Sequence, residues 1–324
     1  MTSPHAVARL DVPPAPALEY QLAPATTAAP LPLPFHRLGL LAQPKRWWRP
    51  LAVLGVAVGL YLALAIVTVI GSAVYLFATT GSWEAMDEAA MMDMSQPVTF
   101  AFTMLSIAVM LPAVLLAVRI VGRRRVGTTM SVVGQLRWGL LGQSMLATLA
   151  CFAVLMVITF VMDPVAPHLK GDVRGALIMA GLAVLVVPFQ AAAEEFAFRA
   201  LPMQALGAWL RHPIWGILLP APLFVWGHSY SVQGQLEIAL FAVIAGYLTW
   251  RTGGLEAAIG LHVVNNLGLS LIATVGLADM NATEISWASA GLSAAYTLAA
   301  AGLIVMVVRR REARGEVVRV GVGR

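Results

Sequence analysis

A pair of carboxylates lies where a charge is costly. Glu194 and Glu195 directly follow an apolar stretch, 175–193, that contains no ionisable residue. Acidic side chains at membrane depth are expensive and usually mark a working site. On a helix, Glu195 and Arg199 are four residues apart and share a face. An ion pair between them would leave Glu194 free to face a cavity. Alternatively, the helix could end here, and Glu195 and Arg199 would then be an interfacial pair with Glu194 exposed to water.

Two further motifs supply histidines and an amide. His228 follows Phe224 by four residues, and His262 precedes Asn266 by four, which places the latter two on one helix face. Taken alone, His228 is a loop residue at a helix end, and the His262 pair could hold two helices together. Histidines together with carboxylates are, however, suited to proton transfer and water activation. The three motifs together therefore predict a catalytic site.

The composition predicts an all-α polytopic membrane protein. Of 324 residues, 59% are hydrophobic and only 11% are charged, which excludes an ordinary soluble domain. The net charge of +5 comes from basic residues in separate loops, so no nucleic-acid partner is expected. The single cysteine, Cys151, excludes an intrachain disulfide and a cysteine-based zinc cluster.

Apolar runs of roughly 20 residues predict about eight transmembrane helices, with the motifs in the C-terminal half. The runs cover 51–78, 97–118, 138–162, 175 through the acidic pair, 213–227, 238–250, 255–275 and 287–308. Pro220 and Pro222 interrupt the short fifth run. Lysine and arginine alternate between loops in a way that predicts both termini in the cytoplasm. The Ala-, Gly- and Arg-rich composition favours a bacterial plasma membrane.

Four regions follow from this pattern. Residues 1–44 are rich in Pro and Ala and are expected to form a disordered cytoplasmic tail. Residues 45–173 contain three spans without a motif, and residues 174–278 carry all three motifs. Residues 279–324 contain the last span and a basic cytoplasmic tail.

The proposed chemistry requires the fourth helix to be long. If that helix ended at Ala193, Glu194 would lie about 20 Å from His228, at 1.5 Å per residue. We therefore predict that the helix continues to about Trp209 and that Pro188 and Pro202 kink it without ending it. We also predict a polar cavity that opens to the cytoplasm.

The three motifs, in this order, resemble those of the CPBP intramembrane protease family. This family comprises CAAX prenyl endopeptidases and bacteriocin-processing or self-immunity proteins and is also called ABI. The resemblance covers about 174–276. A small residue, often Gly, commonly follows the arginine in the family, and Ala200 stands there in this chain.

The resemblance implies hydrolysis of a peptide bond by water. Glu194 and His228 would activate the water, and His262 and Asn266 would donate hydrogen bonds to the oxyanion. The supporting residues implied by the family are Glu195, Arg199 and Phe224. No cofactor is implied, and the expected partners are a peptide or membrane-protein substrate and the lipid bilayer.

Three alternatives remain at this stage. A zinc protease could use two histidines and a glutamate, although the chain has no His-Glu-x-x-His helix and Asn266 is a poor zinc ligand. A proton-coupled transporter could use a Glu-Arg-His relay, although it has no need of an amide beside His262. A scaffold or immunity protein could keep the fold without catalysis. The substrate, and whether it carries a lipid, cannot be read from the sequence.

Overall fold

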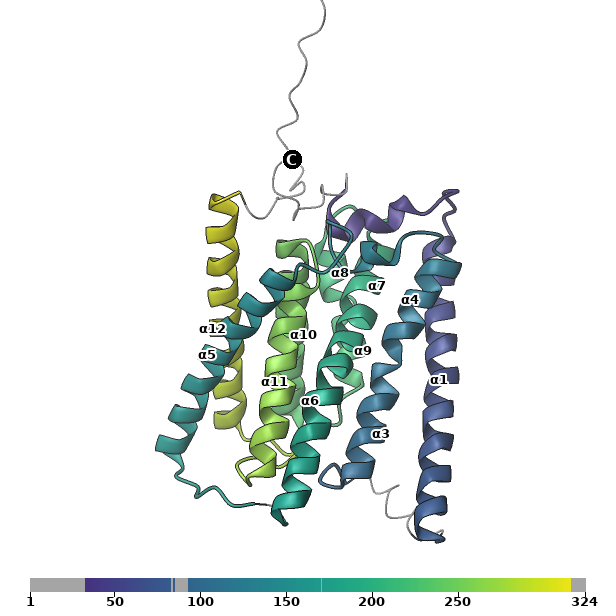
Figure 1. Cartoon of the computed structure of the whole chain (residues 1–324). Coiled ribbons are helices and arrows are strands. Elements are labelled where there is room, and N and C mark those ends of the chain that lie inside the picture. Colours follow the sequence, from purple (N-terminus) through teal and green to yellow (C-terminus); the bar gives the residue numbers. More distant parts are fainter. Residues whose placement is uncertain (1–32, 83, 85–92, 170, 316–324) are drawn as a thin grey trace, which may run out of the picture.

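The fold is a bundle of long apolar helices (Figure 1). The computed structural model describes residues 33–82, 84, 93–169 and 171–315. Within these ranges no strand occurs, and seven helices are long and apolar enough to cross a membrane. They are α1 (Arg49–Thr80), α3 with α4 (Pro97–Ala108 and Met110–Ile120), α5 (Trp138–Met162), α6 with η3 and α7 (Val173–Glu195, Phe196–Ala200 and Leu201–Leu206), α10 (Val232–Thr252), α11 (Glu256–Thr274) and α12 (Trp287–Ala313). The expected all-α polytopic membrane fold is confirmed.

The fifth expected span is not a continuous helix. It consists of two short helices, α8 (Ile214–Leu218) and α9 (Ala221–Trp226). Pro220 lies at the break, and Pro222 occupies the first turn of α9. Proline lacks the N–H that a continuing helix needs and clashes with the preceding turn. The described residues therefore contain seven long helices and one broken segment, and not eight full spans.

Helix α11 lies at the centre of the bundle and α1 at its edge. α11 packs against α5, α6, α10 and α12. In its most apolar window 56% of the residues are buried, against 11% for α1. Leu62, Ile66 and Val69 of α1 remain 53%, 59% and 62% exposed, as expected for side chains that face lipid tails. The helix that carries His262 and Asn266 is thus the most enclosed of the seven.

The segment before α1 is ordered, which corrects one expectation. η1 (Phe35–Leu41) buries Phe35 and Leu38 almost completely against α7 and its neighbours. The prediction of disorder for 1–44 is therefore wrong for Phe35–Leu41, because the apolar side chains of Phe35 and Leu38 pack into a hydrophobic cluster of the bundle. Residues 1–32 and 316–324 lie outside the described residues. η1 and the end of α12 lie at the same end of the bundle (Figure 1).

The loop between α4 and α5, which contains η2 (Val126–Thr129), docks onto the turn that joins α10 to α11. The N–H of Val132 donates to Gly253 O at 2.8 Å, and the N–H of Leu255 donates to Met130 O at 2.9 Å. Gly253 has a φ of 68°, a conformation that glycine adopts without strain. Backbone pairing therefore fixes where α11 begins.

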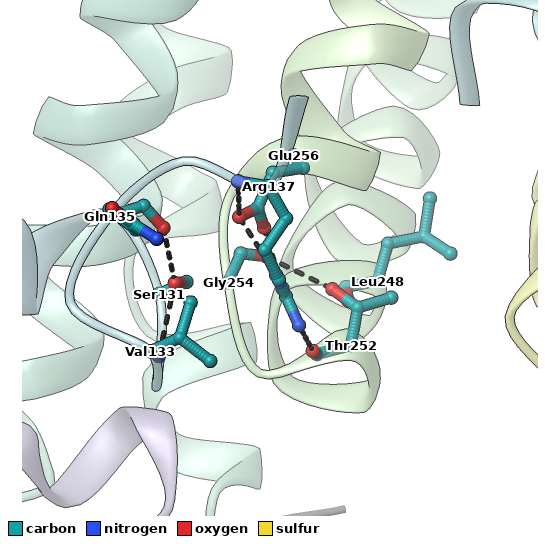
Figure 2. Close-up of polar contacts among 8 residues, drawn as sticks. All are labelled: Ser131, Val133, Gln135, Arg137, Leu248, Thr252, Gly254 and Glu256. Atoms are coloured by element: carbon teal, nitrogen blue, oxygen red, sulfur yellow. Dashed lines mark hydrogen bonds and ion pairs between the residues drawn. The ribbon is translucent and has the colours of Figure 1, made fainter. Parts of the chain in front are cut away.

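A buried ion pair reinforces this junction (Figure 2). Arg137 Nη2 lies 2.6 Å from Glu256 Oε2, and Arg137 Nε donates to Glu256 Oε1 at 2.9 Å. Arg137 Nη1 also donates to the carbonyl of Thr252 at 2.9 Å. Glu256 is in the first turn of α11, where a negative charge is favoured by the helix dipole. The pair thereby ties the start of the central helix to the start of α5.

Candidate active site

The acidic pair lies inside a long helix, as expected. The side chain of Asp172 caps α6 by accepting a hydrogen bond from Gly175 N at 2.7 Å. The helix continues through Pro188, passes through the π-helical turn η3 and ends at Leu206, three residues before the predicted end. Single π-helical turns interrupt α-helices most often at functional sites.

Glu195 and Arg199 form the predicted ion pair. Arg199 Nη1 lies 3.1 Å from Glu195 Oε1, and the two residues are 2% and 0% exposed. The guanidinium of Arg199 also lies over the ring of Phe224, with Cζ 4.0 Å from the ring centroid. Cation–π contacts of this kind are strongest when they are shielded from water. Arg199 is therefore held between a carboxylate and an aromatic ring.

His262 connects the two carboxylates. Its Nδ1–H donates to Glu195 Oε1 at 2.7 Å, which leaves a lone pair on Nε2 in the neutral ring. Nε2 lies 3.4 Å from Glu194 Oε2. A proton placed on Nε2 would therefore lie between the imidazole and the second carboxylate.

An amide network extends from His262 along α11. Asn266 Nδ2 lies 3.1 Å from both His262 Nε2 and Gln190 Oε1, so its two hydrogens have acceptors on α11 and α6. Asn265 Nδ2 donates to Asn266 Oδ1 at 3.3 Å. The residues expected to donate to an oxyanion are thus brought together, but they bind each other when no ligand is present. A ligand oxygen would have to displace one of these contacts.

His228 directly follows the broken fifth segment. Its Nδ1–H donates to the carbonyl of Phe224 at 2.7 Å, and the two rings are in contact at an angle of 49°, with centroids 4.7 Å apart. A backbone acceptor at Nδ1 leaves Nε2 of the neutral ring free to accept a proton. Phe224 therefore orients His228 through both its ring and its carbonyl group.

A cavity of about 600 Å³ joins these side chains. All four residues expected to be catalytic line it: Glu194, His228, His262 and Asn266. Phe224 also lines it, whereas Glu195 and Arg199 lie behind the wall. The cavity walls also carry Glu237, Asp279 and Glu284, and among the described lining residues there is no lysine or arginine. The convergence of three helical segments on one cavity, which the sequence predicts, is present.

The cavity extends away from the described chain ends. Its far wall is formed by Met94 and by the loop between α11 and α12, including Asp279 and Glu284. That loop lies at the end of the bundle opposite η1 (Figure 1). The expectations of cytoplasmic termini and of a cavity open to the cytoplasm both stay predictions. Asp279 and Glu284 make this end of the cavity polar, whereas elsewhere it is lined by Phe224, whose ring contacts the guanidinium of Arg199.

Some residues at the site were not predicted. Gln190 is the single polar side chain within 175–193 and lies one turn before Glu194, so the spacing could have identified it. Phe241 packs edge-on against His262 with ring centroids 5.0 Å apart, but nothing in its apolar surroundings sets it apart. Tyr230, on the loop before α10, lines the cavity, and burial raises the pKa of its hydroxyl, with a smaller contribution from Glu237. It is therefore a neutral hydrogen-bond donor at ordinary pH.

The described residues contain no group of three or more His, Cys, Asp or Glu side chains arranged to hold a metal ion. His262 bonds Glu195 through Nδ1 and approaches Asn266 through Nε2, so both of its nitrogens have partners.

Residues 175–268 match the family model for type II CAAX prenyl endopeptidase Rce1-like proteins. The matched segment begins in α6 and ends in α11, so it contains all three motifs. A curated relative, the uncharacterized protein YyaK of Bacillus subtilis (strain 168), is 26% identical over 242 residues, which cover 70% of this chain and 78% of that protein. No solved structure matches the chain. The resemblance read from the motifs is confirmed, because residues 175–268, which carry all three motifs, match this Rce1-like model of the CPBP family.

Proposed function

We propose that the protein is an intramembrane endopeptidase in which Glu194 and His228 activate a water molecule. The family match supports a membrane-embedded protease of the CAAX type in general. One observation carries the specific mechanism: the carboxylate, both imidazoles and the amide of Asn266 line the same cavity. A base, a partner imidazole and two donors are sufficient parts for acyl transfer to water.

The reaction begins with a water molecule bound between Glu194 and His228. Glu194 accepts a proton from the water, and the oxygen bonds to the carbonyl carbon of the substrate. Asn266 Nδ2–H and a protonated His262 Nε2 donate to the resulting oxyanion. The proton then passes through His228 to the amide nitrogen, the C–N bond breaks, and a carboxylic acid and an amine leave. Donors aligned to an oxyanion are worth about 3 to 4 kcal/mol each in other hydrolases.

The role of His262 depends on Glu195. The ring can donate from Nε2 only when that nitrogen carries a proton, while Nδ1–H already binds Glu195. A carboxylate at Glu195 would stabilise the doubly protonated ring by charge, and Arg199 holds the Glu195 side chain in place from the other side. Glu195 and Arg199 are therefore positioning residues, because neither lines the cavity.

The charge of the cavity indicates the kind of peptide it accepts. Glu194, Glu237, Asp279 and Glu284 line it, and among the described lining residues no basic side chain offsets them. A substrate segment with a positive charge would be attracted, and an acidic one repelled. Peptides that differ only by Lys or Glu near the cleaved bond would measure this preference as a ratio of kcat/KM.

The decisive test compares cleavage products in membranes. Glu194→Gln and His228→Ala are expected to reduce the formation of new peptide termini by about 10²- to 10⁴-fold, the range of general acid–base catalysis. Glu84→Gln, an exposed carboxylate outside the cavity, is the matched control and should cleave normally. If both active-site variants produce the same termini at the parent rate, the protease assignment is wrong.

A chelator experiment separates the zinc alternative. The proposed water activation needs no metal, so purified protein should retain activity after chelation. Loss of activity that zinc alone restores would instead show a metal-dependent mechanism and would leave the assignment as a protease intact.

A further inference from the structure

A second cavity, of about 270 Å³, lies at the end of the bundle where the described chain ends are found. It is formed by the segment from η1 to the start of α1, the end of α4, and α7 with the residues that follow. Of its described lining residues, none also lines the catalytic cavity. This second cavity is therefore a separate feature of the fold.

The lining of the second cavity is basic. It includes Lys45, Arg46, Arg49 and Arg124, and no acidic side chain is present among the described residues that line it. Arg49 and Arg124 are only 7% and 9% exposed. Neither forms an ion pair with a carboxylate in the part of the chain that the structure describes. Burying a guanidinium group without a counter-ion is costly, so the cavity is incomplete without a negative charge.

The polar atoms of the two buried arginines are only partly bonded. Arg49 Nη1 donates to Pro44 O at 2.5 Å, but its Nε has no partner among the described residues. Arg124 Nη1 donates to Thr128 Oγ1. Burial lowers the pKa of Arg124 to about 10, which shows the cost of holding its charge there. An anion with several oxygen acceptors would satisfy both guanidinium groups.

The surroundings place the second cavity at the level of lipid headgroups. Trp47 and Trp48 are 74% and 46% exposed beside it, and Trp209 Nε1 donates to Trp47 O at 3.1 Å. Exposed tryptophans of this kind gather at membrane–water interfaces. Directly below, α1 exposes Leu51 and Val58, by 53% and 56%, along which an acyl chain can lie. The second cavity thus lies beside exposed tryptophans and beside an apolar helix surface.

We propose that the second cavity binds the phosphate of an anionic glycerophospholipid, with Arg49 and Arg124 as its buried partners and Lys45 and Arg46 at the rim. Basic pockets at the ends of membrane helices are suited to anionic headgroups. Gln204 also lines the cavity and is 1% exposed. Its Nε2 donates to Thr128 O at 2.7 Å, while its Oε1 has no partner among the described residues. That acceptor calls for a hydroxyl donor, which a phosphatidylglycerol headgroup carries.

The test is native mass spectrometry of the full chain in detergent, titrated with phosphatidylglycerol or phosphatidylcholine. The parent protein should bind one phosphatidylglycerol preferentially. Arg49→Gln and Arg124→Gln should each weaken this binding by at least about tenfold, as expected when a buried charge partner is removed. Arg309→Gln removes the same charge from an exposed position at the end of α12 and should leave binding unchanged. Equal binding of both lipids by the parent protein would overturn the proposal, as would equal affinities for the cavity and control variants.

Two further arms complete the test. Glycerol 3-phosphate at millimolar concentration should not displace the lipid. Complete displacement would show that a soluble phosphate ester is the ligand and would overturn the lipid assignment.

The double variant Lys45→Gln/Arg46→Gln changes only exposed side chains and should fold even if the buried arginine variants do not. It should weaken binding by about fivefold per charge or less. Full retention of binding by this variant would contradict a role for the rim.

Discussion

Two Arg–Glu pairs with buried carboxylates differ in how fully their polar atoms are hydrogen-bonded. In the Arg137–Glu256 pair, both carboxylate oxygens accept from the guanidinium at 2.6 and 2.9 Å, and the backbone N–H of Arg137 adds a third bond at 2.9 Å (Figure 2). In the Glu195–Arg199 pair, one contact of 3.1 Å joins the two side chains. Among the described residues, Glu195 Oε2 and both terminal nitrogens of Arg199 have no hydrogen-bond partner.

We infer from this difference that the Arg137–Glu256 pair is structural and that the Glu195–Arg199 pair serves the proposed chemistry. A buried polar network stabilises a single structure when it is fully bonded, and unsatisfied buried groups call for an explanation. The incomplete pair is the one that contacts His262 and lies behind the catalytic cavity. We infer that the Arg137–Glu256 pair fixes the position of α11, while the Glu195–Arg199 pair orients the ring of His262.

The largest effect is expected from breaking the complete pair. Arg137→Met would leave the carboxylate of Glu256 buried and unpaired, which should lower the free energy of unfolding by about 3 to 5 kcal/mol. The double variant Arg137→Met/Glu256→Leu removes both charges and should recover most of that loss. Thermal unfolding in detergent would measure both. A single variant as stable as the parent would show that the pair does not hold α11.

The matching double variant at the working pair should separate stability from activity. Arg199→Met/Glu195→Leu also removes both charges, so the protein should unfold at nearly the parent temperature. His262 would lose its Nδ1 acceptor, however, and the rate of cleavage should fall by about a hundredfold, or about 2.7 kcal/mol. Near-parent cleavage by this variant would contradict a positioning role for Glu195.

A smaller effect is expected at the turn beside the complete pair. A methyl group on Gly254 would stand closer than 3.0 Å to Glu256 Oε2, Arg137 Nη2 and Ser131 Cβ. Gly254→Ala should therefore cost about 1 to 3 kcal/mol of stability, as overpacking usually does. Gly142→Ala in α5 is the control, because open space surrounds that position and the helix should gain about 0.5 to 1 kcal/mol. Equal unfolding temperatures for the two variants would show that the junction is loose.

The sequence predicts the residues of the candidate site better than it predicts the Arg137–Glu256 pair. Residues four apart on one helix, such as His262 and Asn266, share a face whatever the rest of the fold does, so their spacing is informative. Arg137 and Glu256 are 119 residues apart, and nothing local indicates that they meet. The long helix through Pro188 could be predicted only because the chemistry of Glu194 and His228 required it.

The N-terminal segment likewise depends on contacts between residues far apart in the sequence. The composition of 1–44 as a whole is rich in Pro and Ala and predicts disorder, because an average over the segment does not distinguish the short stretch around Phe35 and Leu38. Phe35 and Leu38 are ordered because they join a buried cluster that includes Leu201 and Met203 of α7, more than 150 positions further along the chain. Long-range packing therefore decides a feature that local composition cannot.

The smallest expected effect is a loosening of η1 by acid. His36 is 6% exposed; its Nε2–H donates to Arg211 O at 2.9 Å, and its Nδ1 has no partner among the described residues. Burial lowers the pKa of His36 from 6.5, and the nearby charges of Arg37 and His212 lower it further. Below about pH 6.5, His36 therefore binds a proton more readily in the unfolded segment than in the folded one. The contribution of neutral His36 to the stability of η1 is thus complete above pH 6.5 and falls as the pH drops towards the lowered pKa of His36.

Hydrogen exchange at Phe35–Leu41 between pH 7.5 and 5, corrected for the intrinsic exchange rate, would measure this loosening. His36→Gln can still donate to the carbonyl of Arg211 but cannot take up a proton, so its protection should not depend on pH in that range. The catalytic cavity shares no described lining residue with η1, and the rate of cleavage should not follow the same curve. Equal pH dependence in the parent and the Gln variant would show that another group loosens η1.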